Sequence, residues 1–297
     1  MFIRRLPDFE HHAPASVSEA LNLLARYGDK AEVYAGGTDL LVAMKKREKT
    51  PEHLIDLKKI ADMRGIRFDE KKGITIGALT TLEDLERSII VKEQFGTLWD
   101  ALTMMASPQI RSLGTIGGNL CSALPSADTA PPLIALGASA KVVGPDGERN
   151  ILVEHFFRGP KDPALQTNEM LKELFIPKPD GFASGRYLKL MRRNAMDLAL
   201  VGAAAYLRMD SKAKICKEAR IALGAVAPTP IRVQQAEEIL INREIEESRA
   251  AEAGKAASEV CRPISDIRSS LAYRRTMVEV LTKRAVMEAY GKILSSK

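Results

Sequence analysis

Two short runs of small residues carry the strongest chemical signal in the sequence. Residues 115–128 contain a glycine pair, Gly117 and Gly118, and end on a carboxylate, while residues 33–40 contain a second glycine pair followed by a threonine and an aspartate. Glycine has no Cβ, so main-chain N–H groups in such runs can approach another molecule closely. We therefore predict that the two runs grip one anionic group, with a pyrophosphate as the best candidate.

The glycine runs match neither of the common nucleotide-binding fingerprints. They lack the G-x-G-x-x-G of the dinucleotide-binding Rossmann fold, and they also lack the G-x-x-x-x-G-K-[ST] of the P-loop. Either pair taken alone is better explained as a tight turn. Two runs with the same chemistry in one chain favour a different kind of nucleotide-binding fold.

Four segments resemble the flavin (medium) subunit of the molybdenum hydroxylases, which include xanthine dehydrogenase and carbon monoxide dehydrogenase. Ala-Gly-Gly-Thr-Asp at 35–39 and Thr-Ile-Gly-Gly-Asn at 115–119 are similar to the two FAD loops of that family. The segments at 187–199 and 265–275 are similar to two further stretches. The resemblance therefore covers essentially the whole chain, whose length of 297 residues fits a free-standing subunit.

The resemblance implies an α+β chain with the FAD-binding fold of vanillyl-alcohol oxidase (the PCMH type). We expect an N-terminal α/β FAD-binding subdomain at 1–60 and a middle FAD-binding sheet subdomain at 61–178. A C-terminal sheet-plus-helix domain of the carbon monoxide dehydrogenase flavoprotein type would follow at 179–297. FAD would lie between the first two parts, with its ring reaching toward the third.

The resemblance also implies which residues bind the cofactor, whereas it implies neither a catalytic residue nor a metal ligand on this chain. The expected FAD-binding residues are Val33, Tyr34, Ala35, Gly36, Gly37, Thr38, Asp39, Leu40, Met105, Thr115, Ile116, Gly117, Gly118, Asn119, Asp128, Leu171 and Lys189.

Several of these side chains have an equally simple structural interpretation. Asp39 is directed toward a ribose or caps a helix N-terminus. Met105 touches the adenine side of FAD or fills a gap in the core. Asp128 accepts hydrogen bonds from FAD or caps the helix that follows it, and Leu171 packs against the flavin or is an ordinary sheet residue.

Lys189 carries the most specific functional expectation. A cation near the pyrimidine edge of an isoalloxazine ring stabilises the negative charge of the reduced flavin and raises its potential. The alternative is a solvated lysine on a strand. Asp197, eight residues further on, is expected to pair with Arg192 or Arg193 instead of touching the cofactor.

The function implied by the resemblance is electron transfer. The chain would take electrons from the 2Fe-2S clusters of a small subunit and pass them to an external acceptor, since a flavin holds one or two electrons. A large subunit would carry the molybdenum cofactor, and the complex would be a dimer of heterotrimers. Two other classes remain open: a stand-alone flavin-dependent oxidoreductase with its own substrate, and a non-catalytic nucleotide-binding partner.

Composition excludes several other classes of protein. The net charge of +6 is mild, its lysines and arginines are interleaved with acidic residues, and aromatic residues make up only 5%, so nucleic-acid binding has little support. No segment approaches the roughly 20 apolar residues of a membrane span. We expect a cytoplasmic protein in a reducing environment.

The cysteines and histidines form no recognisable catalytic or metal-binding pattern. No C-x-x-C pair is present, so neither a zinc site nor an iron-sulfur cluster is expected. The histidines match no Ser-His-Asp or Cys-His arrangement, which makes a hydrolase improbable on sequence grounds. These residues are Cys121, Cys216, Cys261, His11, His12, His53 and His155.

Caps and hydrophobic periodicity predict the elements that position these residues. Ser16 and Glu19 form a capping-box signature for a helix through Arg26, after an extended stretch at 9–14. A strand, the first glycine run and a helix should then follow in that order. Further strands are predicted at 53–57, 73–78, 171–176, 186–190, 198–209 and 217–226, and helices from 81, over 95–106, after 128, and over 233–241, 250–260 and 273–290.

Overall fold

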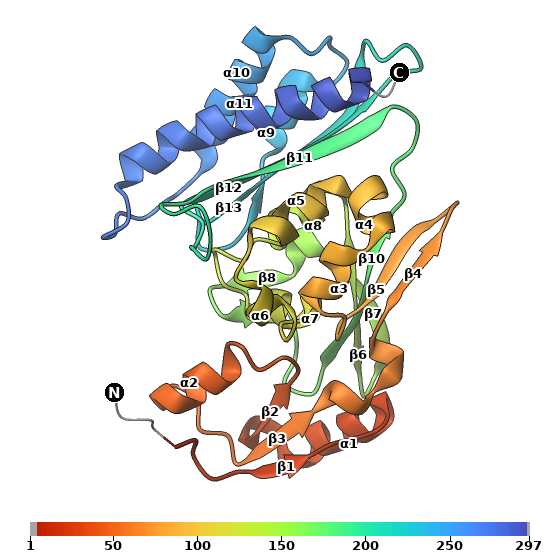
Figure 1. Cartoon of the computed structure of the whole chain (residues 1–297), viewed down its shortest axis with the longest axis vertical. Helices are drawn as coiled ribbons and strands as arrows, with labels where there is room; N and C mark the ends of the chain where they lie inside the picture. Colours follow the sequence, from red (N-terminus) through yellow and green to blue (C-terminus); the bar gives the residue numbers. More distant parts are fainter. Residues whose placement is uncertain (1–4, 296–297) are drawn as a thin grey trace.

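The structure is a computed structural model that describes residues 5–295. The three larger sheets follow one another along the longest axis of the molecule in chain order (Figure 1), and a fourth sheet has only two short strands, at 157–159 and 162–163. The N-terminal sheet lies at the bottom of the view, a five-stranded sheet lies in the middle, and a four-stranded sheet with three helices lies at the top. This α+β arrangement agrees with the fold class expected from the sequence.

The N-terminal sheet is parallel, with strand order β1-β3-β2. Its strand β1 was expected only as an extended stretch, because nothing local in a three-residue segment specifies a parallel partner more than 40 residues away. The elements are β1 (Glu10–His12), α1 (Val17–Tyr27), β2 (Ala31–Tyr34), α2 (Leu40–Lys46) and β3 (His53–Asp56), with 3-10 turns at Gly28–Lys30, Leu57–Lys59 and Ala61–Met63.

The capping-box prediction for α1 is confirmed, with one change of partner. Ser16 Oγ accepts a hydrogen bond from the Glu19 N–H at 3.2 Å, as the signature requires. The Glu19 carboxylate reaches back to the N–H of Ala15 at 2.7 Å, one residue before the expected one. The first interaction satisfies a main-chain donor of the first helical turn, and the second satisfies the N–H of the residue just before the N-cap.

Replacing Ser16 with alanine should destabilise the N-terminal part of the chain modestly. Loss of an N-cap hydroxyl typically costs about 1 kcal/mol, because the freed helix N–H has no other side-chain acceptor. We expect an earlier denaturant midpoint by circular dichroism and full recovery in Ser16→Thr. An unchanged midpoint in Ser16→Ala would show that the cap contributes nothing to α1.

The middle sheet is antiparallel, with strand order β4-β5-β10-β6-β7. Two of the helices of this part, at 96–104 and 130–135, pack against the C-terminal sheet, whereas those at 108–111 and 116–121 lie nearer the N-terminal part (Figure 1). The buried side chains of the middle sheet belong to one core cluster shared with the N-terminal part. The elements are β4 (Ile66–Asp69), β5 (Gly73–Gly77), α3 (Leu82–Arg87), α4 (Ile89–Gln94), α5 (Gly96–Met104), α6 (Pro108–Arg111), α7 (Ile116–Cys121), α8 (Ala130–Ala135), β6 (Ser139–Gly144), β7 (Gly147–Leu152), β8 (Phe157–Gly159), β9 (Asp162–Pro163) and β10 (Met170–Pro177), with a 3-10 turn at Val153–His155.

The C-terminal sheet is buried on both faces. Alternate residues of its strand β12 belong to different cores: Ala203 and Leu207 pack toward the C-terminal helices, whereas Ala204 and Tyr206 pack toward the middle part. The elements are β11 (Ala183–Leu190), β12 (Val201–Met209), β13 (Cys216–Gly224), β14 (Ile231–Arg232), α9 (Gln234–Leu240), α10 (Glu247–Val260) and α11 (Leu271–Ser295). The face of this sheet that meets the middle part can therefore contribute side chains to a site there.

The predicted strands and helices are largely confirmed, and the differences have local causes. The predicted strand at 198–209 begins only at Val201, because the Asp197 carboxylate holds a turn by accepting the N–H groups of Arg192 and Arg193. The expected pairing of Asp197 is confirmed for Arg193, whose Nη2 lies 3.5 Å from Asp197 Oδ1. Among residues 5–295, none of the helices has both the length and the apolar character needed to cross a bilayer.

Candidate functional site

The first glycine run connects β2 to α2 as a tight loop. Gly37 has φ +72°, a left-handed conformation that side chains rarely adopt, and a Cβ atom there would overlap the ring of Tyr34. That ring in turn lies 3.6 Å from the Lys58 ammonium, measured to the ring centroid. The loop conformation therefore depends on glycine at this position.

The first glycine run also carries unused hydrogen-bond donors. The N–H groups of residues 36–39 donate to no acceptor within residues 5–295, and the same holds for the Thr38 hydroxyl. They stand just before the N-terminus of α2, whose dipole favours an anion. Asp39 occupies the N-cap position of α2, but its side chain makes no capping hydrogen bond, so the capping alternative for Asp39 is wrong.

The second glycine run is a capped helix and not an open loop. Thr115 Oγ1 caps α7 by accepting the Gly118 N–H at 3.0 Å, and the Asn119 N–H donates to the Thr115 carbonyl at 2.9 Å. The N–H groups of Ile116 and Gly117 also donate within the chain. The N–H groups of residues 116–119 are therefore not free, because the helix cap and the adjoining chain use them.

The two glycines of the second run have different structural roles. Gly117 is buried, and a Cβ atom there would lie 2.7 Å from the Cβ and carbonyl oxygen of Ala78, so its absence permits close packing. Gly118 is partly exposed, and a Cβ atom there would approach only Thr115 Oγ1, at 3.0 Å. Only Gly118 therefore presents an open surface to a ligand.

The structure brings the two glycine runs together. A Cβ atom on Gly36 would overlap the carbonyl oxygen of Leu113 and lie 3.0 Å from the Cα of Gly114, the residue before Thr115. Thr38 Oγ1, from the first run, would lie 3.8 Å from a Cβ atom built on Gly114. Donors of the first run and the surface of the second can thus face one ligand.

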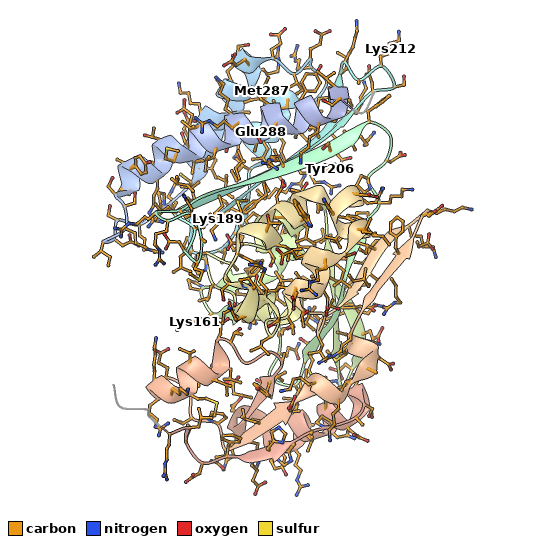
Figure 2. The ribbon with its side chains drawn as sticks, in the orientation of Figure 1. Lys161, Lys189, Tyr206, Lys212, Met287 and Glu288 are labelled. Atoms are coloured by element: carbon orange, nitrogen blue, oxygen red, sulfur yellow. The ribbon has the colours of Figure 1, made fainter. Side chains whose placement is uncertain are left out.

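Asp128, Tyr187 and Lys189 form a buried polar cluster where β11 meets the middle part. Lys189 Nζ donates to Asp128 Oδ2 at 2.8 Å and to the Met104 carbonyl at 3.2 Å, and Tyr187 Oη donates to Asp128 Oδ1 at 2.9 Å. The Lys189 side chain is 0% exposed. Figure 2 labels Lys189 at the level where the C-terminal sheet meets the middle part. The alternatives of a solvated Lys189 and a helix-capping Asp128 are therefore wrong.

Burial and charge act in opposite directions on this cluster. Burial raises the pKa of the Asp128 carboxyl, whereas the Lys189 ammonium and the Tyr187 hydroxyl lower it by stabilising the charged form. Burial first, and then the neighbouring carboxylate, raise the pKa of Tyr187 well above its ordinary value, so this phenol stays neutral and donates. The charge of Lys189 is consequently balanced inside the protein.

The remaining predicted residues lie in less open positions. Met105 and Leu171 are 5% and 4% exposed in the core, which agrees with the structural interpretation of each. Asn119 Oδ1 accepts the Thr129 hydroxyl at 2.6 Å, beside Asp128. Val33 and Ala35 pack against the core, Leu40 begins α2, and Ile116 is fully buried.

Two groups that bond to Asp128 and Lys189 were not predicted from the sequence: the Tyr187 hydroxyl and the Met104 carbonyl. Tyr187 lies two residues before Lys189, so strand alternation places both side chains on one face of β11, and this signal was available. The Met104 carbonyl could not be anticipated, because it depends on how the end of α5 packs against β11.

Comparison with known proteins identifies the chain. Residues 7–179 match the family described as "FAD binding domain in molybdopterin dehydrogenase", and residues 186–289 match the "CO dehydrogenase flavoprotein C-terminal domain". The first match covers more than half of the chain. The chain belongs to the molybdenum hydroxylase flavin subunits. It is accordingly an FAD-dependent oxidoreductase subunit with the PCMH-type fold expected from the resemblance.

Relatives of this flavin subunit match it over nearly their full length. The carbon monoxide dehydrogenase medium chain of Hydrogenophaga pseudoflava is 37% identical over 96% of this chain and 98% of its own. The xanthine dehydrogenase FAD-binding subunit of Escherichia coli O157:H7 is 32% identical over 94% and 95%. A solved structure of the Hydrogenophaga carbon monoxide dehydrogenase, lacking the Mo-pyranopterin moiety, superposes with TM-score 0.92 and 36% identity over 97% and 99%.

The residues present in this flavin subunit fit FAD in two respects. The free N–H groups of residues 36–39 form a main-chain cradle suited to a pyrophosphate. An ammonium has three N–H donors. Two donors of Lys189 have acceptors among the described residues, namely the Asp128 carboxylate and the Met104 carbonyl. One donor of the buried Lys189 ammonium therefore remains without an acceptor among the described residues.

Proposed function

We propose that this chain is the FAD-carrying electron-transfer subunit of a heterotrimeric molybdenum hydroxylase. A small subunit with 2Fe-2S clusters would supply electrons, a large subunit would carry the molybdenum cofactor, and an external acceptor would receive the electrons. The observation that supports this most is the nearly full-length similarity to chains named medium chain and FAD-binding subunit. A chain that matches such subunits from end to end is best understood as one component of a larger complex.

The proposed cofactor contacts divide between two surfaces. Residues 36–39 bind the pyrophosphate through their main-chain donors, and Gly118 lets the ligand lie against α7. Asp128 and Lys189 hold the cofactor from the side of β11 through their remaining hydrogen-bonding capacity. When bound, FAD supplies one- and two-electron redox chemistry, which the protein side chains do not have.

Gly118→Val should weaken FAD binding without loss of the fold. A Cβ atom at this position approaches only the Thr115 hydroxyl, and we expect the methyl groups of valine to extend into the space assigned to the ligand. We expect FAD affinity to fall about tenfold, equivalent to about 1.4 kcal/mol. Fluorescence titration of the apoprotein with FAD measures this change, and circular dichroism monitors the fold.

Gly96→Val is the matched control, because nothing lies within 4 Å of a Cβ atom at that position. It should bind FAD as the wild type does. Equal FAD affinity in Gly118→Val and the wild type would remove α7 from the proposed binding surface.

Purification of the native complex tests the proposed function as a whole. We expect the chain to co-purify with one larger and one smaller partner subunit. The complex should contain molybdenum and iron, and FAD should be bound to this chain. The isolated chain should not oxidise a substrate of its own. Substrate turnover by the isolated chain would support a stand-alone flavin enzyme, and a native protein without flavin or partners would contradict the proposal.

A further inference from the structure

Three metal-ligating atoms meet on the N-terminal sheet, outside the proposed FAD contacts. His12 Nε2 lies 3.2 Å from His53 Nδ1 and 3.7 Å from Glu10 Oε2, and His53 Nδ1 lies 3.4 Å from the same carboxylate oxygen. The sequence gives no hint of this cluster, because 41 residues separate the two histidines. Parallel strand pairing alone brings them together.

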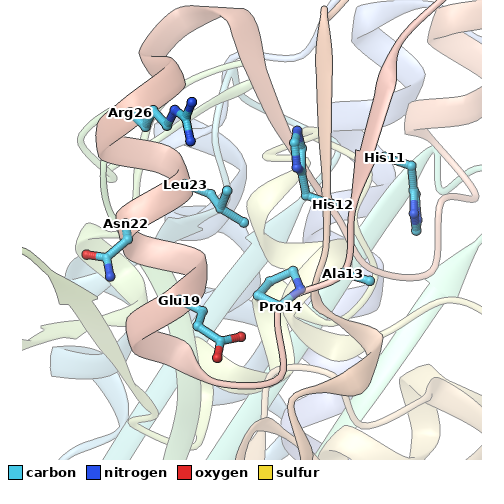
Figure 3. A pocket seen from close by; sticks show the side chains of 8 residues that line it. All are labelled: His11, His12, Ala13, Pro14, Glu19, Asn22, Leu23 and Arg26. Carbon is cyan, nitrogen blue, oxygen red and sulfur yellow. The ribbon is translucent and has the colours of Figure 1, made fainter.

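Strand alternation explains why these three side chains share a face. Glu10 and His12 are two residues apart on β1, and Glu10 pairs directly with His53 on β3. The intervening His11 points to the opposite face of β1, where its Nε2 lies 3.1 Å from Asp56 Oδ2. In Figure 3, His12 lies on the side of α1 and His11 on the far side of the strand.

The triangle of donor atoms has the size of one face of a zinc coordination sphere. Zinc bonds of 2.0–2.2 Å in a tetrahedral site place neighbouring ligand atoms about 3.3–3.6 Å apart. The three measured separations, 3.2, 3.4 and 3.7 Å, lie within about 0.2 Å of that range. We propose that Glu10, His12 and His53 form a binding site for a divalent zinc-type cation.

The two imidazoles are already held in position for such an ion. The Tyr27 ring of α1 stacks on His53 at 3.7 Å between centroids and on His12 at 5.1 Å. The side chains of His12 and His53 are only 20% and 13% exposed, whereas Glu10 is 70% exposed. The protein thus supplies two fixed nitrogens and one adjustable oxygen, and a water completes the tetrahedron.

The ion would join the edge strand of the sheet to its centre. β1 is only three residues long and lies at the sheet edge, next to β3. A cation shared by Glu10, His12 and His53 cross-links these two strands in the folded state, so binding stabilises the N-terminal sheet by mass action. Imidazole nitrogens favour zinc, copper or nickel over magnesium and calcium, which prefer all-oxygen ligands.

Isothermal titration of the full-length chain with zinc chloride tests the site. We expect one saturable site in the wild type and no saturable binding of magnesium chloride. His12→Gln and His53→Asn should each weaken zinc binding by at least about tenfold, the scale of effect already seen when only an outer partner of a metal ligand is lost. X-ray absorption of the zinc-loaded protein should show light-atom neighbours at about 2.0–2.2 Å and no sulfur.

Three further variants make the test specific. Glu10→Gln changes an exposed side chain, so the protein should fold normally yet bind zinc more weakly. Two control variants should bind zinc as the wild type does. His11→Gln changes a residue on the same strand but the opposite face, and His155→Gln changes a side chain that is 72% exposed. The proposal is overturned if the wild type takes up no zinc, or if the cluster variants bind zinc as tightly as the two controls.

Discussion

Gly36→Ala is expected to yield a protein that retains almost no FAD. A Cβ atom at this position would overlap the carbonyl oxygen of Leu113 and approach the Cα of Gly114 to 3.0 Å. Both obstacles are main-chain atoms, so no side-chain rotation relieves the overlap, and the two runs must move apart. If one pyrophosphate is held between them, FAD affinity should fall by more than about 100-fold, or about 2.7 kcal/mol.

The ratio of flavin absorbance to protein absorbance in the purified variant measures this loss. Gly96→Ala is the matched control, because a Cβ atom there meets nothing within 4 Å, and it should keep its full flavin content. Far-ultraviolet circular dichroism should show that Gly36→Ala still folds, since the contact involves loops and not the core strands. Full flavin occupancy in Gly36→Ala would refute a ligand shared by the two runs.

Lys189→Met should lower the free energy of unfolding by about 3–5 kcal/mol, the usual cost of leaving a buried charge without its partner. The variant keeps the apolar stem of the side chain but deletes the cation that lies 2.8 Å from the buried Asp128 carboxylate. The Tyr187 hydroxyl alone cannot balance that charge. Denaturant unfolding at neutral pH measures the change.

The double variant Lys189→Met/Asp128→Asn separates loss of the ion pair from loss of packing. Removing both charges should restore much of the lost stability, because the remaining amide keeps hydrogen bonds without an unpaired charge. Lys283→Met, which removes one partner of the more exposed pair with Glu247, should change stability little. Equal stability of Lys189→Met and the wild type would show that Lys189 does not neutralise Asp128.

The pH dependence of Lys189→Met has a definite sign. Burial already raises the pKa of Asp128 in the folded protein, and loss of the Lys189 ammonium removes the main opposing effect. A carboxyl whose folded pKa exceeds its unfolded pKa binds a proton more tightly when folded, so lowering the pH favours the folded state. The stability deficit of the variant should therefore shrink from pH 7 to about pH 5.

The pairing of Lys189 with Asp128 bears on the expectation that Lys189 raises the flavin potential. Asp128 lies 2.8 Å from the Lys189 ammonium, so the opposite charges offset one another. At a flavin ring beside this pair, the field would be much weaker than that of a free ammonium. A positioning role through the remaining N–H donor fits this environment better than tuning by a bare charge.

The sequence by itself determined the family, the order of the elements and many of their ends. Local signals sufficed there: Ser16 and Thr81 cap the predicted helices with their own hydroxyls, and the alternating pattern of 73–78 becomes β5. These features depend on residues within one turn or one strand of each other. The two glycine runs were recognisable because their spacing is also local.

Only the tertiary structure decided how distant residues use their groups. The second glycine run includes a capped helix whose N–H groups at 116–119 donate to Thr115, Thr80 and Ala78. Lys189 is paired with the carboxylate of Asp128, 61 residues away in the sequence. Likewise, His12 and His53 meet only because β1 and β3 pair in parallel. Hydrogen-bond partners and charge compensation depend on packing between elements, which no local pattern of residues specifies.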